Sequence, residues 1–328
     1  MKTVDFDSLY KRELLPQLQP FENRRKKIVA NLLRLHGVML TLIVVAAPVI
    51  YFFLHEQGQL RVHPWVGFLV IPVLVVYVGL HAWIKGSYSK DFKAEVVGRL
   101  VKAMGPSLEY SPTGSISREE FVRGRLFLTD LDRFRGEDLV QGRVGETEIR
   151  FSEIHAEDRR TRTDSKGRTQ HYYVTIFRGI YFVADFHKDF QGQTVVLPDV
   201  AEKSFGWLGK AMQKMNMRSE KLVHLENPEF EKEFVVYSTN NQQARYILTP
   251  SFMESLLAFR RKNERAIHVS FVNSNIHIAL SSTKDRFEPW LYKSILNPEL
   301  LRGFVADIGF LTGIVDDLNL NTRIWSKA

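Results

Sequence analysis

Two uncharged stretches near the N-terminus constrain this chain more than any other feature of its sequence. Residues 35–54 and 62–84 contain no Asp, Glu, Lys or Arg. At about 1.5 Å per residue, each stretch is long enough as a helix to cross a hydrocarbon core of roughly 30 Å. Charged segments flank both stretches, so we expect a transmembrane helical hairpin rather than the core of a soluble protein.

The distribution of basic residues predicts the orientation of this hairpin. Residues 1–104 hold 14 Lys and Arg against 7 Asp and Glu, whereas the rest of the chain is nearly neutral. The connecting loop carries a single basic residue, Arg61. The positive-inside rule then predicts a multi-pass membrane protein with both termini in the cytoplasm, which in a bacterium would place it in the cytoplasmic (inner) membrane. Six basic residues are expected to face lipid headgroups: Arg24, Arg25, Lys26, Lys27, Lys85 and Lys90.

The content of the two spans favours an anchor over a pore. Their ionisable residues are His36, His63 and His81, which lie close to the span ends where the interface can solvate them. Pro48 and Pro72 are expected to kink the helices, as proline does in many membrane helices. An oligomeric channel or transport accessory subunit is an alternative that requires several copies to share a path.

Patterning divides the chain into four segments. Residues 1–34 form a cytoplasmic N-terminal segment and residues 35–84 the hairpin. Residues 85–104 read as a juxtamembrane amphipathic helix, because their apolar residues recur at intervals of three to five. Residues 105–328 form a cytoplasmic domain, introduced by a linker rich in Gly and Pro.

The cytoplasmic domain is predicted to be α+β with a mainly antiparallel sheet, since its strands and helices come in blocks. A capping box at Ser117 and Glu120 predicts a short helix to about residue 126, and Gly179 is expected to mark a turn or bulge. The expected strands cover residues 148–157, 171–186, 193–197, 222–225, 234–238, 267–272 and 276–280. Further helices are expected at residues 200–216, 250–262 and 298–318.

Motifs that carry chemistry are missing from the sequence. The chain has no cysteine, which excludes disulfides, thiolate metal sites and a cysteine nucleophile. It contains no Walker loop, no GxGxxG turn, no HExxH, no EF-hand loop and no GxSxG elbow. We therefore expect no cofactor and assign no catalytic residue.

One weak metal pattern remains on two predicted strands. Glu153, His155 and Glu157 alternate, so they would share one face of a strand, and Asp185 and His187 repeat the alternation. If the two strands are neighbours, Glu153, His155, Asp185 and His187 can converge on a divalent ion or form an acid–base pair. A solvated strand edge is the competing interpretation.

The segment 158–168 holds the one basic cluster of the domain. Its arginines could contact lipid headgroups, nucleic acid or an acidic partner, or could belong to a solvated hairpin tip. The near-zero net charge of the domain disfavours nucleic acid.

Several segments of the domain resemble a known family. The core segments are FRGIYFVADFHKDF at 177–190 and residues 194–199; others lie at 136–138, 151–153, 244–250 and 270–273. The chain is similar in these segments to the bacterial membrane-protein family catalogued as domain of unknown function three-one-three-seven (DUF3137). The resemblance implies two N-terminal membrane helices before a cytoplasmic domain, and it implies no reaction and no catalytic residue.

These observations lead to one leading hypothesis and two alternatives. The leading hypothesis is a non-enzymatic protein, anchored in the lipid bilayer, whose cytoplasmic domain binds a protein partner or assembles into a homo-oligomer. The first alternative is a membrane-associated metal-dependent or acid–base enzyme, and the second is the oligomeric channel or transport accessory subunit.

Overall fold

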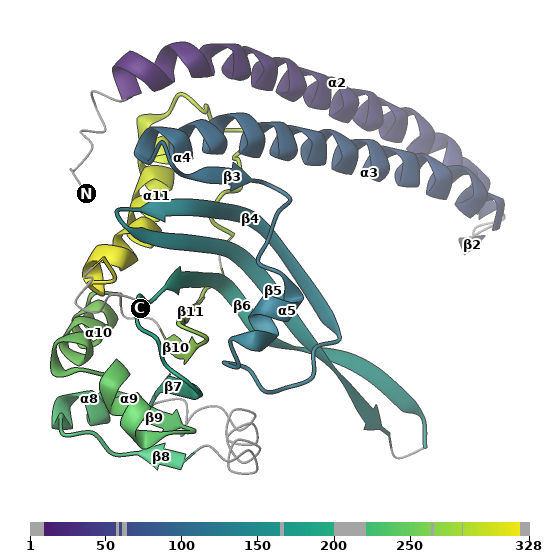
Figure 1. Cartoon of the computed structure of the whole chain (residues 1–328). Helices are drawn as coiled ribbons and strands as arrows, with labels where there is room; N and C mark the ends of the chain where they lie inside the picture. Colours follow the sequence, from purple (N-terminus) through teal and green to yellow (C-terminus); the bar gives the residue numbers. More distant parts are fainter. Residues whose placement is uncertain are drawn as a thin grey trace. The chain divides into compact units, whose positions relative to one another are not determined.

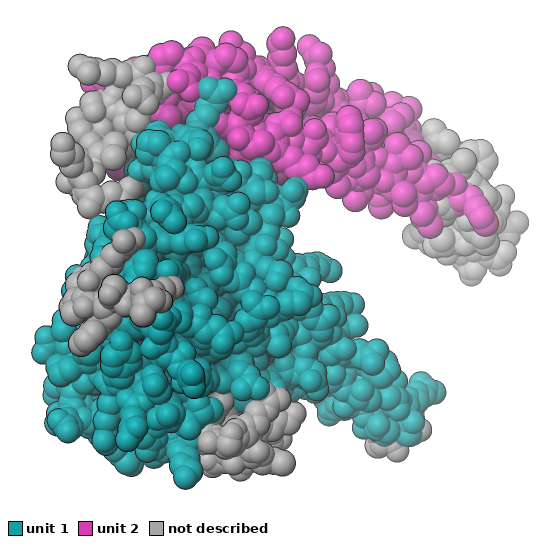
Figure 2. Space-filling model, in the orientation of Figure 1, with its two compact units in different colours: residues 1–3, 97–287, 304–328 teal, residues 4–96, 288–303 magenta. Residues whose placement is uncertain are grey.

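The computed structural model describes residues 10–56, 59–60, 64–164, 167–199, 221–263, 266–283 and 285–321 (Figure 1). The chain forms two compact units (Figure 2). One unit comprises residues 4–96 and 288–303, and we call it the helical unit. The other comprises residues 1–3, 97–287 and 304–328, and we call it the sheet unit.

The helical unit is built on two long neighbouring helices. A π-helical turn η1 (Tyr10–Leu14) leads into α2 (Leu15–Leu54), and α3 (Pro64–Phe92) follows the short paired strands β1 (His55–Glu56) and β2 (Gln59–Leu60). Both helices are long and apolar enough to cross a membrane, and the apolar window of each is exposed. Side chains such as Val44, Phe68 and Val75 would otherwise face water. The two helices thus indicate membrane association.

The part of the helical unit beyond the apolar stretches is held together by charged groups. Residues 288–303 pack there against α2 and α3, and Glu22, Arg25 and Lys93 are all buried. A π-helical turn, η2 (Lys93–Val97), follows α3 and leads into α4 (Gly98–Met104). Helical structure thus continues from α3 to Met104, with a π-helical interruption at Lys93–Val97.

The sheet unit contains one nine-stranded sheet in which every pairing is antiparallel. The strand order is β3-β4-β5-β6-β11-β10-β7-β9-β8. The strands are β3 (Glu109–Ser111), β4 (Arg133–Val144), β5 (Thr147–Thr163), β6 (Thr169–Asp185), β7 (Gln193–Pro198), β8 (Lys221–Val223), β9 (Phe234–Ser238), β10 (Ile267–Val272) and β11 (Asn275–Ser281). The helices are α5 (Arg118–Arg123), α8 (Pro228–Glu233), α9 (Asn241–Ile247), α10 (Pro250–Asn263) and α11 (Pro298–Asp317). The predicted α+β class is confirmed.

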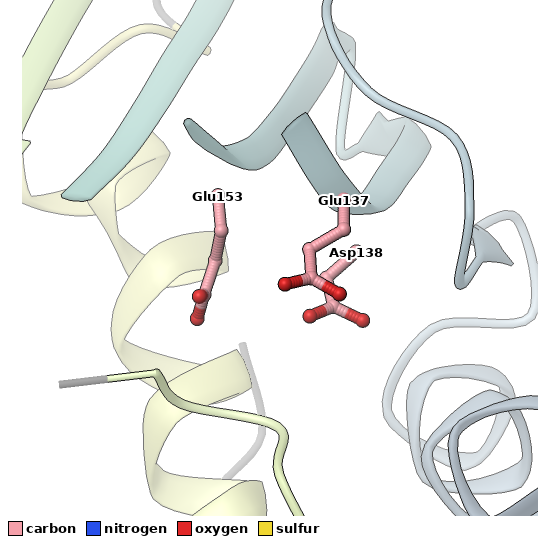
Figure 3. Close-up of side chains that lie close together, drawn as sticks. All are labelled: Glu137, Asp138 and Glu153. Atoms are coloured by element: carbon pink, nitrogen blue, oxygen red, sulfur yellow. The ribbon is translucent and has the colours of Figure 1, made fainter. Parts of the chain in front are cut away.

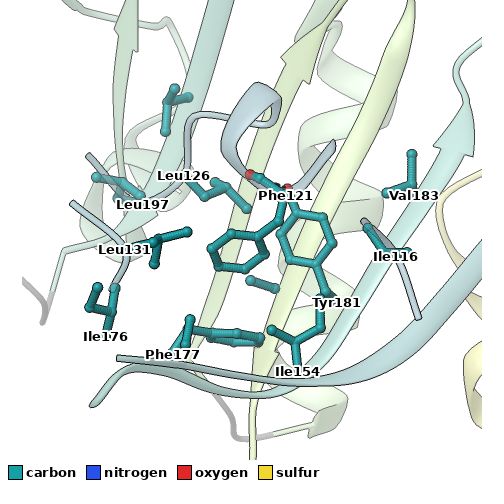
Figure 4. Packing of buried hydrophobic residues seen from close by; sticks show 13 residues of the cluster. Ile116, Phe121, Leu126, Leu131, Ile154, Ile176, Phe177, Tyr181, Val183 and Leu197 are labelled. Carbon is teal, nitrogen blue, oxygen red and sulfur yellow. Dashed lines mark hydrogen bonds between the residues drawn. The ribbon is translucent and has the colours of Figure 1, made fainter. Parts of the chain in front are cut away.

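Apolar side chains cover both faces of the sheet. Every residue of β7 and β10 is buried, as expected for strands covered on two sides. On one face, Phe121 of α5 packs against Phe177 and Tyr181 of β6 in a cluster that also includes Ile154 (Figure 4). On the other face, Phe151 of β5 stacks on Phe182 of β6, and the α11 side chain Phe304 stacks on Phe287.

The local signals of the sequence are confirmed at two places. Ser117 caps α5, and its hydroxyl accepts a hydrogen bond from the backbone N–H of Glu120 at 3.1 Å. The β10–β11 hairpin turns at Asn273 and Ser274, which adopt φ values of 51° and 60°.

Three predictions about strands need correction. β4 was not expected, because Arg133–Val144 contains glycines and many charged residues. β5 continues to Thr163, well into the segment expected to be a polar tip. β6 runs through Gly179 without a turn, and the extra residue of the β5–β6 pairing lies between Thr175 and Phe177 instead. At Gly179, φ is +147° and the backbone lies close to β11. The helix expected at residues 200–216 lies outside the described residues.

Candidate functional site

The four predicted metal ligands lie on neighbouring strands, but the register of these strands separates them. In the β5–β6 pairing, Glu153 is opposite Ile180, and four residues away Ile149 is opposite Ala184. Residues that are directly opposite share a face, so Asp185 projects to the face opposite Glu153 and lies further along the sheet. The structure therefore does not bring Glu153 and His155 together with Asp185 and His187.

Each half of that prediction instead forms a local pair. The His155 ring lies 3.2 Å from the Thr175 hydroxyl and 3.8 Å from the Glu157 carboxylate. Asp185 accepts a hydrogen bond from the backbone N–H of His187 at 3.0 Å, and its second oxygen lies 3.3 Å from the His187 ring. Such contacts between residues two apart are ordinary in turns and at strand ends.

A different set of carboxylates does converge. Glu137 and Asp138 of β4 and Glu153 of β5 each offer an oxygen, and these oxygens lie within 4.8 Å of one another (Figure 3). We call this set the carboxylate cluster.

A β-bulge brings the two neighbouring residues of β4 into this cluster. Consecutive residues of a regular strand point to opposite faces. Here the register shifts between Glu137, which is opposite Glu153, and Val140, which is opposite Phe151, so β4 carries one extra residue. Asp138 takes up the bulge with φ of +60°. Its carboxylate can therefore lie near that of Glu137, where an unbroken strand would have placed it on the far side.

Hydrogen bonds from neighbouring residues partly compensate the negative charge of the cluster. The Tyr110 hydroxyl of β3 donates a hydrogen bond to Asp138, which is almost completely buried. The backbone N–H of Arg286 donates to Glu153 at 2.7 Å, and the Arg286 guanidinium pairs with Asp307 of α11. Burial, and then the three carboxylates, raise the pKa of Tyr110 well above its usual range, so the phenol stays protonated and remains a donor.

Three carboxylates at this spacing form the kind of oxygen-rich set that Mg²⁺, Ca²⁺ or Mn²⁺ prefers. The same carboxylates accept hydrogen bonds from Tyr110 and Arg286, which is the pattern of a structural network. The geometry thus permits cation binding without requiring it.

One sequence signal points to the three residues. The segments 136–138 and 151–153, on which part of the family resemblance rests, contain all of them. Only the β4–β5 register and the bulge show that these segments meet.

A second feature of the sheet unit is an exposed two-stranded extension. β4 pairs with β5 as far as Glu157, and β11 pairs with β6 as far as Gly179. Beyond these points residues 158–163 and 169–174 pair with each other, and we call them the β5–β6 arm. The arm projects away from the rest of the sheet (Figure 1) by about 20 Å, given about 3.4 Å per residue.

The surface of the arm combines arginine with tyrosine. Arg159 and Arg162 are exposed on opposite faces and make no ion pair with the residues that the structure describes. Tyr172 and Tyr173 are also exposed. The Arg133 guanidinium stacks 3.3 Å from the centroid of the Tyr173 ring.

The residues expected at lipid headgroups fall into two groups. Arg24, Lys26, Lys27, Lys85 and Lys90 are exposed at the same end of the helical unit, where Arg24 pairs with Asp91 of α3 at 2.6 Å. Arg25 is buried instead, and the Nε and Nη2 atoms of its guanidinium donate to the two carboxylate oxygens of Glu22. Its charge is therefore engaged within the protein.

The groove between α2 and α3 near Pro72 has an apolar lining. It measures about 290 Å³ and is bordered by side chains such as Leu35, Met39, Val76 and Leu80. The His36 and His81 rings stack beside it with centroids 5.7 Å apart. An apolar surface of this kind fits contact with lipid chains better than a path for ions.

Residues 175–320 match the model of a family described as protein of unknown function (DUF3137). This part of the chain is thus similar to the DUF3137 family. The resemblance inferred from sequence motifs is thereby confirmed for most of the sheet unit, and the match leaves α2, α3 and the carboxylate cluster outside. No curated protein and no solved structure matches the chain.

Proposed function

We propose that this chain is a non-enzymatic membrane-anchored binding protein whose β5–β6 arm docks an acidic protein partner. The observation that carries the proposal is the arm itself. It is a ribbon with two open edges, exposed arginines on both faces and exposed tyrosines between them. An isolated ribbon of this kind buries little apolar surface, so contact with a partner would bury more of it and stabilise the arm.

The chemistry of the arm favours a protein over other acidic partners. The Asp132 carboxylate accepts the backbone N–H of Arg159, and along the rest of the arm no third strand of the described chain pairs with either edge. An extended peptide can pair with the edge groups there, whereas lipid headgroups and nucleic acids cannot form a β-ladder. Asp158 and Asp164 flank the arginines of β5, and Asp158 pairs with Arg160 at 3.3 Å. This mixed pattern suits salt-bridge complementarity with a protein better than a continuous track for phosphates.

The role as an anchor is supported by α2 and α3. In the proposed topology both helices span the cytoplasmic membrane, the β1–β2 loop lies outside, and both termini lie in the cytoplasm. The exposed basic residues gather at the end of the hairpin away from that loop.

The absence of native cysteine makes this topology directly testable. Gln59→Cys in β2 and Gln170→Cys in the arm each introduce a single thiol. In intact cells a membrane-impermeant maleimide should label the first variant and leave the second unlabelled until the membrane is permeabilised. Labelling of both variants in intact cells would contradict the proposed orientation.

Binding is tested on the full chain in lipid nanodiscs with three fluorescent probes: an acidic extended peptide, a single-stranded oligonucleotide and an anionic vesicle. The peptide should bind, and the double variant Arg159→Gln/Arg162→Gln should weaken that binding at least about tenfold, with strong salt dependence. The matched control, Arg143→Gln/Lys221→Gln, removes two exposed cations elsewhere on the sheet unit and should leave binding unchanged.

Three results would overturn the proposal. Equal peptide binding by the arm variant and the control variant would exclude the arm as the docking surface. Preferential, arm-dependent binding of the oligonucleotide or the vesicle would assign a different partner class. Dissociation of a homo-oligomer by the arm variant would show that the arm binds a second copy of the chain.

A further inference from the structure

The segment 288–296 crosses from one long helix to the other within the helical unit. Glu288 accepts a hydrogen bond from Ser89 of α3 at 3.1 Å and pairs with Lys93 at 2.7 Å. The Leu291 carbonyl then accepts a hydrogen bond from Arg25 of α2 at 2.7 Å. Further along, Ile295 N–H donates to Glu22 and the Leu296 carbonyl accepts from Tyr10. The successive partners Arg25, Glu22 and Tyr10 lie progressively further from the apolar stretch of α2. Residues 288–293 are therefore the part of the segment nearest to that stretch.

This nearest part exposes two large aromatic rings while its aliphatic neighbours are buried. Leu291 and Ile295 are 7% and 1% exposed, whereas Trp290 and Tyr292 are 50% and 62% exposed. The Lys293 ammonium lies 3.5 Å from the centroid of the Trp290 ring. Trp and Tyr have an apolar body and a polar tip, and such residues are enriched at the interface between a bilayer and water.

The distance along α3 places the segment at the outer side of the headgroup layer. Ser89 lies five residues beyond Ile84, the end of the uncharged stretch, which corresponds to about 8 Å of helix. The headgroup layer on each side of the hydrocarbon core is roughly 5–8 Å thick. Glu288 is bonded to Ser89 and also to Lys93, which lies about 14 Å beyond Ile84, so the segment begins at or just outside the edge of this layer. Long aromatic side chains that leave the segment there can reach back into the layer. The exposed cations Lys85 and Lys90 occupy the same level of α3.

We propose that Trp290, Tyr292 and Lys293 form a membrane-interface contact, in which the two rings enter the headgroup layer and the ammonium group binds an anionic lipid phosphate. The occupant is the bilayer that α2 and α3 cross, because the segment continues that surface and carries the complementary charge. The inference rests on the proposed membrane topology. It adds a membrane contact that lies more than 200 residues from the second span in sequence.

The test measures the depth of single tryptophans in the full chain. In one variant the other four tryptophans are replaced by Phe, which leaves Trp290 alone, and a second variant keeps Trp83 alone. A third variant lacks all five native tryptophans and carries Tyr172→Trp on the β5–β6 arm. Each is placed in nanodiscs that contain anionic lipid brominated near the headgroup end of the acyl chain, where bromine quenches nearby indoles.

We expect Trp290 to be quenched at least half as strongly as Trp83 and the arm tryptophan to be unaffected. Adding Lys293→Gln to the Trp290 variant should reduce this quenching, and the reduction should vanish in nanodiscs of neutral lipid. If the multiple Phe substitutions impair folding, Trp290→Cys labelled with an environment-sensitive dye gives the same readout in an otherwise unchanged chain.

The outcomes separate this inference from the proposed topology. Quenching of Trp83 without quenching of Trp290 would overturn the interface contact and leave the membrane span intact. Absence of quenching at both positions would overturn the span and the contact together. Equal quenching at Trp290 and on the arm would show unspecific access of lipid, and the contact would again be rejected.

Discussion

Arg25 and Glu22 form a buried, two-pronged ion pair one turn apart on α2. The guanidinium Nε and Nη2 atoms lie 2.9 and 2.7 Å from the two carboxylate oxygens. The remaining groups are also engaged, since Arg25 donates to the Leu291 carbonyl and Glu22 accepts from the Ile295 N–H. A buried ion pair with all its partners satisfied is costly to break, because the group left behind is a charge without compensation.

Glu22→Gln is therefore expected to destabilise the chain strongly. Glutamine can still accept from Ile295, but it leaves the Arg25 charge buried and unbalanced, at a cost of about 3–5 kcal/mol. Unfolding of the full chain in mild detergent, followed by hydrogen exchange of residues 288–296, measures this effect. The matched control is Asp91→Asn, which breaks the exposed pair with Arg24 and should cost no more than about 1 kcal/mol. Equal losses in the two variants would contradict the importance of burial.

Stability is expected to fall as the pH drops below about 6.5, because two histidines are buried in the sheet. Burial lowers the pKa of His268 to about 4 and that of His277 to about 3, and nearby arginines add to both shifts. Below pH 6.5 the unfolded chain binds protons that the folded chain does not, so protonation favours unfolding. Each histidine should cost about 2 kcal/mol by pH 5.

His268→Leu tests this pH dependence. The His268 Nδ1 atom makes no hydrogen bond within the described part of the chain, but the ring does bond to the Ala279 backbone. The test therefore compares the loss between two pH values within each variant. Denaturant unfolding of the full chain at pH 7 and pH 5 should show an acid-induced loss smaller by about 2 kcal/mol in the variant. His171→Leu removes an exposed imidazole on the arm and should leave the acid-induced loss unchanged. An unchanged loss in His268→Leu would refute the assignment.

Tyr110→Phe is expected to cost about 2 kcal/mol at neutral pH, since it removes the hydroxyl that donates to the buried Asp138 carboxylate. Tyr172→Phe, which removes an exposed hydroxyl on the arm, is the control and should have little effect. The measurement is denaturant unfolding with and without millimolar Ca²⁺ or Mg²⁺. If the carboxylate cluster is a structural network, these cations should not stabilise the unsubstituted chain; a large stabilisation would show that the cluster binds a cation.

Replacing glycine by alanine should change the free energy of unfolding in opposite directions at two positions. At Gly179, φ is +147° and an added Cβ would lie 2.1 Å from the Leu280 carbonyl oxygen, so Gly179→Ala should lose at least about 2 kcal/mol. At Gly303, in α11, an added Cβ meets nothing within 4 Å, so Gly303→Ala should gain about 0.5–1 kcal/mol from helix propensity. Thermal unfolding of the full chain compares the two. A mild effect at Gly179 would mean that the β6–β11 pairing is looser there than the structure indicates.

The parts of the fold that follow from composition and local pattern could be predicted from sequence. The uncharged stretches 35–54 and 62–84 identify the long helices because length and hydrophobicity alone decide that case. The cap at Ser117 and the turn at Asn273 are equally local, because each depends on a few neighbouring residues.

The parts that depend on pairing could not be predicted. The outer half of β5, including Arg159 and Arg162, is exposed on both faces, so no alternation of apolar residues distinguishes it from a loop. The carboxylate cluster depends on a one-residue bulge at Asp138 and on the register between Glu137 and Glu153. Neither leaves a recognisable pattern in a single sequence, because register is set by contacts between distant segments.

The position of residues 288–303 bears on how this protein can be divided. The linker that follows Met104 in the sequence suggests a truncation at this point, which would give a fragment without α2 and α3. Leu291 and Ile295 are buried in the unit that contains α2 and α3, and Lys93, the partner of Glu288, would be removed. A fragment truncated there would expose the apolar side chains of Leu291 and Ile295 and leave Glu288 without Lys93, so it should be prone to aggregate. Residues 288–303 thus belong to the same compact unit as α2 and α3, although nearly the whole sheet separates them in the sequence.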